Sequence, residues 1–146
     1  MSNPAIQMLE QGIEFVKRSG LKVEALERGR VVCRMPLAGN VNHIGTMYAG
    51  ALFTLAEIPG GALFLSSFDA GKFYPIVTDL QISFKKAVKS DATVEICMED
   101  AEIERIQAEA TTNGKALFEL RGELRNADGE LVATSVGQYQ MRQIGR

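Results

Sequence analysis

Apolar and small side chains dominate the sequence from Asn42 to Phe68, and Glu57 is the only charged residue within it. After a polar opening loop this run leaves no polar stripe, so it predicts a helix that is buried on nearly every side. Its length favours a helix, because strands rarely exceed about ten residues. Glu57, Pro59 and Gly60 interrupt its middle and argue against a membrane span. A carboxylate in a buried helix is costly unless it is paired or has a function.

The flanking patterns predict strands and two further helices. Strand-like runs cover residues 21–27, 30–36, 92–98, 117–125 and 131–141, and a long strand begins near Tyr74. A first helix ends at Gly20, is capped by Ser2 or Asn3, and carries apolar residues at helical spacing, namely Ile6, Leu9, Ile13 and Val16. Residues 100–113 fit a short helix, with a strand continuation as the alternative.

This order of elements predicts one α+β domain over all 146 residues. A single sheet can bury a helix that is apolar all round only by curling around it. We therefore expect a curved antiparallel sheet wrapped around the long central helix. The far side of that helix must be closed by the first helix, by loops or by a second copy of the chain. The glycines after Pro59 leave room either for a ligand or partner helix or for ordinary packing.

Composition narrows the classes of function. A net charge of −2 and a pI of about 5.5 give no basic surface for nucleic acid. Cys33 and Cys97 fall in apolar strand patterns, which predicts buried free thiols in a reducing compartment. The first fifteen residues lack the features of a signal peptide, so we expect a cytoplasmic protein. One histidine and two distant cysteines do not make a usual metal site.

The loop and helix start carry a recognisable spacing. It consists of Asn42, Gly45, Tyr48, Ala49 and Gly50, followed seven residues after Gly50 by Glu57. This spacing is similar to the motif Asn-x-x-Gly-x-x-His-Gly-Gly that hotdog-fold thioesterases typically show, with an acid seven residues past the last glycine. The chain thus resembles the hotdog thioesterase superfamily that includes phenylacetate-pathway and 4-hydroxybenzoyl-CoA thioesterases, from about residue 20 to its end. Tyr48 and Ala49 replace the His-Gly of the motif.

The resemblance implies hydrolysis of acyl-CoA or a related thioester by a homo-oligomer, a dimer or tetramer, without a metal or redox cofactor. Glu57 would be the general base or nucleophile, and Asn42 would position water or the acyl carbonyl. The N–H groups of Ala49 and Gly50 at the helix start suit a developing oxyanion. Because Glu57 lies two turns further, about 10–12 Å along the axis, the site would be shared between two chains.

Other residues remain open to two interpretations. Tyr48 follows Gly45 by three positions in the motif loop, and it could donate to a substrate carbonyl or only close the loop. His43 could act with Glu57 as a dehydratase base or be an exposed loop residue. Lys85 and Lys86 could bind the phosphates of coenzyme A or form a solvated strand end. The alternatives to a thioesterase are therefore a hotdog hydratase or dehydratase and a non-catalytic acyl-CoA-binding protein.

Overall fold

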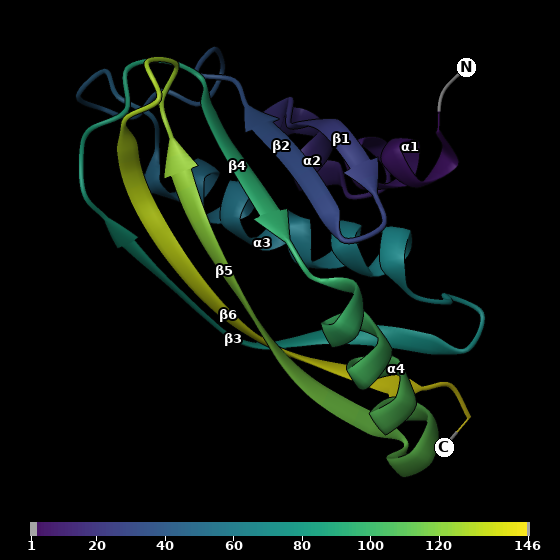
Figure 1. Cartoon of the computed structure of the whole chain (residues 1–146). Coiled ribbons are helices and arrows are strands. Elements are labelled where there is room, and N and C mark those ends of the chain that lie inside the picture. Colours follow the sequence, from purple (N-terminus) through teal and green to yellow (C-terminus); the bar gives the residue numbers. More distant parts are fainter. Residues whose placement is uncertain (1–2, 146) are drawn as a thin grey trace.

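The computed structural model describes residues 3–145, in which helices lie against one curved sheet (Figure 1). Along the chain the elements are α1 (Pro4–Gln11), α2 (Glu14–Ser19), β1 (Lys22–Glu27), β2 (Arg30–Met35), α3 (Ala49–Ser67), β3 (Phe73–Phe84), β4 (Ala92–Cys97), α4 (Asp100–Asn113), β5 (Lys115–Arg125) and β6 (Leu131–Gln143). This arrangement confirms the predicted α+β class.

The six strands form one antiparallel sheet in the order β1-β2-β4-β5-β6-β3. Burial alternates strictly along β5, so one face of the sheet is turned to the core and the other to solvent. The long strands β3, β5 and β6 bend together around the inner face (Figure 1). β1 and β3 are the two edges of the sheet, so each has one side on which no strand of this sheet is paired.

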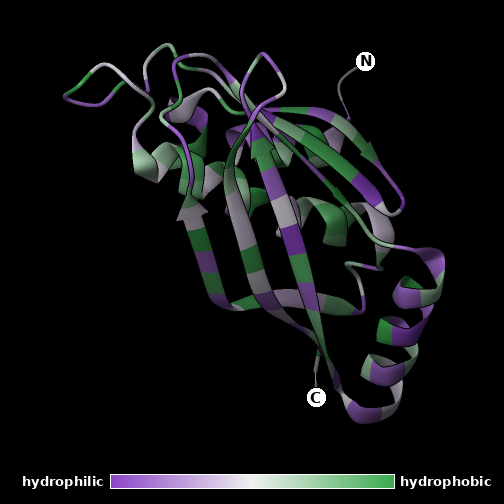
Figure 2. Ribbon diagram, turned by 60° about the vertical axis from the view of Figure 1, so that its left-hand side comes forward, coloured by the Kyte–Doolittle hydropathy of each residue, from purple (hydrophilic) through white to green (hydrophobic). Residues whose placement is uncertain are grey.

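Helix α3 is the predicted apolar helix, and it lies in the hollow of the sheet (Figure 1). Twelve of its nineteen residues are buried, and much of the helix has the hydrophobic colour in Figure 2. α1 packs against α3 and closes part of the far side. Within residues 3–145, α3 alone is long and apolar enough to cross a membrane, and its place inside the sheet explains that composition.

Gly60 makes room for an aromatic ring from the sheet. A Cβ at Gly60 would lie 2.4 Å from Cε1 of Tyr139 on β6. Tyr139 stacks on Phe118 of β5 with ring centroids 5.3 Å apart, and Phe118 lies 6.4 Å from the ring of Phe68 just after α3. Gly60 is therefore a packing notch, whereas a Cβ at Gly61 would meet no atom within 4 Å.

The predicted first helix is wrong in one respect, because it consists of the two helices α1 and α2. The chain breaks at Gly12, a residue that weakens helices by about 1 kcal/mol. Ile13, expected to pack, lies 51% exposed between the two helices. Asn3 caps α1 by accepting a 2.8 Å bond from the Ala5 N–H, while Ser2 lies outside the described residues.

Two further expectations are decided by burial and backbone geometry. Residues 100–113 form α4, which ends at Gly114 with φ of 84°, so the strand alternative is wrong. Cys97 is exposed, contrary to prediction, because the alternation of β4 turns its neighbour Ile96 inward instead. Cys33 is buried as predicted, and burial raises the pKa of its thiol to about 12.

Gly60→Ala should lower the free energy of unfolding by about 1–3 kcal/mol, the usual cost of overpacking a core. The added Cβ meets the ring of Tyr139, which is itself held by stacking. Gly61→Ala is the matched control, because within the described chain the same methyl group meets no atom within 4 Å and alanine favours the helix by about 0.5–1 kcal/mol. Denaturant unfolding of both variants measures the difference. Equal effects would contradict the role of Gly60 as a notch.

Candidate functional site

One face of α3 is left uncovered by the rest of the chain. Residues four positions apart share a helix face, and at this spacing α3 carries five residues that are exposed or half-buried. We call them the open stripe: Ala49, Phe53, Glu57, Gly61 and Leu65. All other residues from 51 to 64 are buried. Glu57 is the only charged residue of the stripe and lies at its centre.

The Glu57 carboxylate has neither a hydrogen bond nor an ion pair with any residue in the described part of the chain. Partial burial raises its pKa above the usual value for glutamate, because desolvation disfavours the charged form. Burial, and secondly the charge of Glu57, raise the pKa of Tyr139 to about 12. A carboxylate in such surroundings is a better general base near neutral pH than a free glutamate.

The start of α3 presents unpaired N–H groups. Tyr48 is the N-cap residue, and its carbonyl accepts from the N–H groups of Ala51 and Leu52 at 3.0 and 3.2 Å. Within residues 3–145, the N–H groups of Ala49 and Gly50 have no acceptor, as expected for a first helical turn. The Tyr48 ring folds over Gly50, where an added Cβ would lie 2.3 Å from the ring.

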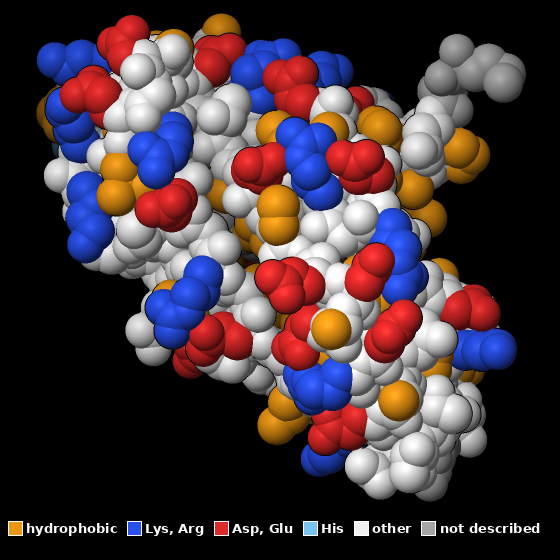
Figure 3. Space-filling model, viewed as in Figure 1, with side chains coloured by type: hydrophobic (Ala, Val, Ile, Leu, Met, Phe, Trp, Pro, Cys, Tyr) orange, Lys and Arg blue, Asp and Glu red, His pale blue; other side chains and the backbone are white. Residues whose placement is uncertain are grey.

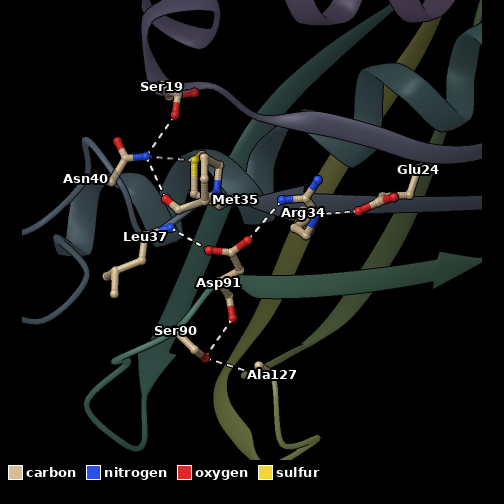
Figure 4. A network of polar contacts seen from close by, with 10 residues as sticks. Ser19, Glu24, Arg34, Met35, Leu37, Asn40, Ser90, Asp91 and Ala127 are labelled. Carbon is tan, nitrogen blue, oxygen red and sulfur yellow. Dashed lines mark hydrogen bonds and ion pairs between the residues drawn. The ribbon is translucent and has the colours of Figure 1, made fainter.

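Asn40 fixes the loop that leads to this helix start. Its Nδ2 donates to the carbonyl oxygens of Ser19 and Pro36, each at 2.8 Å (Figure 4). Its own carbonyl accepts from the N–H of Tyr48 at 2.8 Å. Asn40 therefore ties the end of α2, the end of β2 and the start of α3 together.

Asp91 holds the other side of the same loop. Its carboxylate accepts from the Leu37 N–H and from the Arg34 guanidinium, both at 2.9 Å (Figure 4). Ser90 beside it donates to the Asp91 carbonyl and accepts from the N–H of Ala127 at 3.0 Å. The loop before α3 is thus attached to β2, to the start of β4 and to the β5–β6 turn.

Asn42 uses its amide within its own loop. Its Oδ1 accepts from the N–H groups of Ile44 and Thr46 at 3.0 Å, and its Nδ2 donates to Thr46 Oγ1 at 2.9 Å. Gly45 has φ of 88°, which glycine adopts without strain. His43 is exposed at the tip of this turn. These contacts make Asn42 a loop-shaping residue, and its role toward substrate stays a prediction.

The two chemical parts of the candidate site stand apart within one chain. Glu57 lies eight positions after Ala49, which corresponds to about 12 Å along the helix axis. Phe53 lies between them on the open stripe. A single chain therefore offers a carboxylate at one place and N–H donors at another.

The lysines after β3 are partly neutralised by acids. Lys86 forms an ion pair with Glu130, and together with Lys89 and Asp128 they line a hollow of 320 Å³. On the face shown in Figure 3, basic and acidic side chains are interspersed and no continuous basic stripe appears. Lys85 is exposed. A phosphate-binding role for Lys85 and Lys86 stays a prediction.

Comparison with known proteins places the chain in a family. A protein-family model described as a domain of unknown function, DUF4442, matches residues 6–141. The chain belongs to the DUF4442 family. The search of curated proteins found no match to the chain. A solved structure from Pseudomonas aeruginosa, PA5026, described as a protein of unknown function and probable thioesterase, is 50% identical over 98% of both chains, with a TM-score of 0.93.

More distant solved structures share the fold of this DUF4442 protein. Thioesterase HI1161 from Haemophilus influenzae is 14% identical, with 99% of this chain and 95% of that chain covered and a TM-score of 0.75. A mutant of thioesterase PA1618 from Pseudomonas aeruginosa is 15% identical, with 98% and 97% covered and a TM-score of 0.76. At this identity the similarity establishes the fold alone, and it confirms the hotdog arrangement of the predicted superfamily.

Sequence reasoning missed three residues that shape the site. The alternation of β6 could have placed Tyr139 inward, but its proximity to Glu57 depends on how the sheet wraps α3. Asn40 and Asp91 gave no local signal, because their partners lie up to 57 positions away in the sequence. Among the described residues, no group of three or more His, Cys, Asp or Glu side chains is arranged to hold a metal ion. A carboxylate base and helix N–H donors are groups used in acyl transfer.

Glu57→Gln should make the DUF4442 protein more stable relative to wild type as the pH rises. The pKa of Glu57 is raised in the folded state, so between the unfolded and folded pKa values the native state binds more protons than the unfolded state. Stability contributed by this group is then lost as pH increases through that window. Denaturant unfolding from about pH 4, near the unfolded glutamate pKa, to neutral pH measures the trend. A difference that shrinks with rising pH would contradict it.

Proposed function

We propose that this protein hydrolyses acyl-CoA or a related acyl thioester at a site shared by two copies of the chain. The observation that carries the proposal is Glu57, a half-buried carboxylate without a partner in the described chain, at the centre of the open stripe. The description of the 50% identical Pseudomonas aeruginosa protein as a probable thioesterase supports the same reaction class. Glu57 is the catalytic group of the proposed reaction.

The proposed chemistry uses both parts of the site. The thioester carbonyl oxygen accepts hydrogen bonds from the N–H groups of Ala49 and Gly50, which stabilise the developing oxyanion. Glu57 either removes a proton from the attacking water or attacks the carbonyl itself to give an acyl anhydride that water then cleaves. In both routes the carbon–sulfur bond breaks, the thiol leaves with a proton, and the free acid is formed. The Tyr48 ring folds over Gly50 at the helix start, which supports a role for its hydroxyl as a donor to the acyl carbonyl.

A second copy brings these parts together in the proposal. If the partner helix runs antiparallel, Glu57 of one chain approaches the Ala49–Gly50 turn of the other. Two features support association. β3 is a free edge of twelve residues with a single charge, at Asp79, and such edges are normally paired or protected. Ile44 and Tyr48 in the loop before α3 are 70% and 58% exposed.

Glu57→Gln should lower the turnover of the preferred acyl-CoA by at least about 100-fold, the range for losing a general base. Release of free thiol across short, medium, long and aromatic acyl-CoAs measures it. Glu104→Gln, at an exposed position of α4, is the matched control and should keep full turnover. His43→Ala should also keep thioesterase activity, whereas a dehydratase would lose its base. Saturable acyl-CoA binding without turnover in the wild type would identify a binding protein and contradict the proposal.

Ala49→Pro tests the role of the helix N–H groups in the reaction with little change to the fold. Ala49 is the first residue of α3, where proline is tolerated, and Tyr48 before it has φ of −60° and ψ of 137°, which suits a residue before proline. The substitution removes one unpaired N–H and no helical hydrogen bond. We expect kcat to fall by about 10²–10³-fold with the fold retained. Circular dichroism and thermal unfolding provide the check on folding.

Mixing the two inactive variants tests whether the site is shared. A mixed dimer of Glu57→Gln and Ala49→Pro chains has one intact site, made from Glu57 of one chain and Ala49 of the other. Random assembly gives half mixed dimers with one working site of two, so co-refolded chains should regain about a quarter of the wild-type rate. A mixture that stays inactive would place both groups within one chain and contradict the shared site.

A further inference from the structure

A small hollow opens beside Glu57 between α3 and the α1–α2 segment. Its volume is 180 Å³, and Glu57 forms part of its wall. Ile13 and Phe15 line it from the α1–α2 side, and Phe53 and Thr54 line it from α3. Three of these side chains are large, apolar and well exposed: Ile13 at 51%, Phe15 at 53% and Phe53 at 41%. The described chain thus leaves apolar surface uncovered around its unpaired carboxylate.

The hollow lacks donors for a polar ligand. Thr54 is its only hydroxyl residue, and that hydroxyl donates to the Gly50 carbonyl at 2.8 Å within the helix. Apart from Glu57 and Thr54, the lining consists of aliphatic and phenyl side chains. An apolar group is therefore the chemistry that this wall can accept without leaving polar atoms unpaired.

The volume of the hollow indicates the size of the group that it can hold. A cavity of about 150 Å³ lined by apolar side chains holds one benzene molecule, which has six carbons. A hollow of 180 Å³ accordingly fits an acyl group of about six carbons or a single phenyl ring. A long fatty acyl chain would extend far beyond it.

We propose that the hollow lined by Ile13, Phe15, Phe53 and Thr54 binds the acyl part of the substrate and selects an apolar acyl group of about six carbons. This inference rests on the proposed thioesterase function, since it places the thioester carbon beside Glu57 at the mouth of the hollow. Phe53 and Phe15 are then the residues that determine chain length. The carrier thiol lies outside the hollow, toward the helix start that the second copy contributes to the proposed site.

The test is a profile of kcat/KM against acyl length, from acetyl-CoA to palmitoyl-CoA, with phenylacetyl-CoA as the aromatic member. Each buried methylene favours binding by about fourfold, so full burial of the four additional methylenes of hexanoyl-CoA should raise kcat/KM over that of acetyl-CoA by up to about 250-fold. Phe53→Ala and Phe15→Ala enlarge the hollow and should move the optimum to longer chains by two or more carbons. Ile13→Trp fills it and should lower the preference for hexanoyl-CoA over acetyl-CoA.

Leu117→Ala is the matched control, because Leu117 is 58% exposed on the outer face of β5 and does not line the hollow. Its profile should equal that of the wild type. Hexanoyl-CoA binding to the inactive Glu57→Gln variant, followed by calorimetry, gives a readout that does not depend on turnover. Phe15→Ala and Ile13→Trp should each weaken that binding by about fourfold or more, while Leu117→Ala should not.

The outcomes separate the inference from the proposed function. Thiol release with a profile that none of the three lining variants alters would overturn the hollow as the acyl site and leave the thioesterase intact. A wild type that releases no thiol but binds hexanoyl-CoA through the hollow would overturn the reaction and keep the binding site. Lining variants that become monomeric without a change in acyl preference would assign this surface to a second copy and also overturn the inference.

Discussion

The burial of α3 is the constraint on which the rest of the structure depends. A helix without a polar stripe is stable in water only if other elements remove its surface from solvent. The curved sheet covers most of it, α1 covers another part, and the open stripe is what remains. Glu57 lies in that remainder, where it keeps some contact with water but is surrounded by apolar side chains that raise its pKa. The part of α3 that the rest of the chain leaves uncovered is therefore also the part that carries Glu57.

The helix start is positioned by residues outside the helix. Asn40 and Asp91 attach the preceding loop to β2, to the end of α2 and to the start of β4, and Tyr48 closes over Gly50. Asn42 shapes the turn that precedes these contacts. Unpaired N–H groups stabilise a developing charge best when they are fixed in advance, because no reorganisation is then needed during the reaction. The loop network provides that fixation for the proposed site.

Most of the fold was predictable because its periodicities are strong. The apolar run predicted α3, the alternating runs predicted the strands, and Gly20 predicted the end of α2. The break at Gly12 was not predictable, since an apolar period continued through it and one glycine costs only about 1 kcal/mol. The position of Glu57 on an uncovered stripe was not predictable either, because a helix that is apolar all round does not show which face lacks a partner. Tyr139 and the partners of Asn40 depend on long-range contacts that only the folded chain reveals.

A purely structural explanation of Glu57 is weak. A leucine at this position would continue the apolar character of Phe53 and Leu65 along the open stripe and avoid the desolvation of a carboxylate. A structural acid needs a cation or hydrogen-bond donors, and residues 3–145 provide none to Glu57. The donors that the fold does leave unpaired are the N–H groups at the start of α3, about 12 Å away on the same helix. These unpaired donors and the unpaired carboxylate are complementary in hydrogen bonding, which is why the proposed function brings them together through a second copy of the chain.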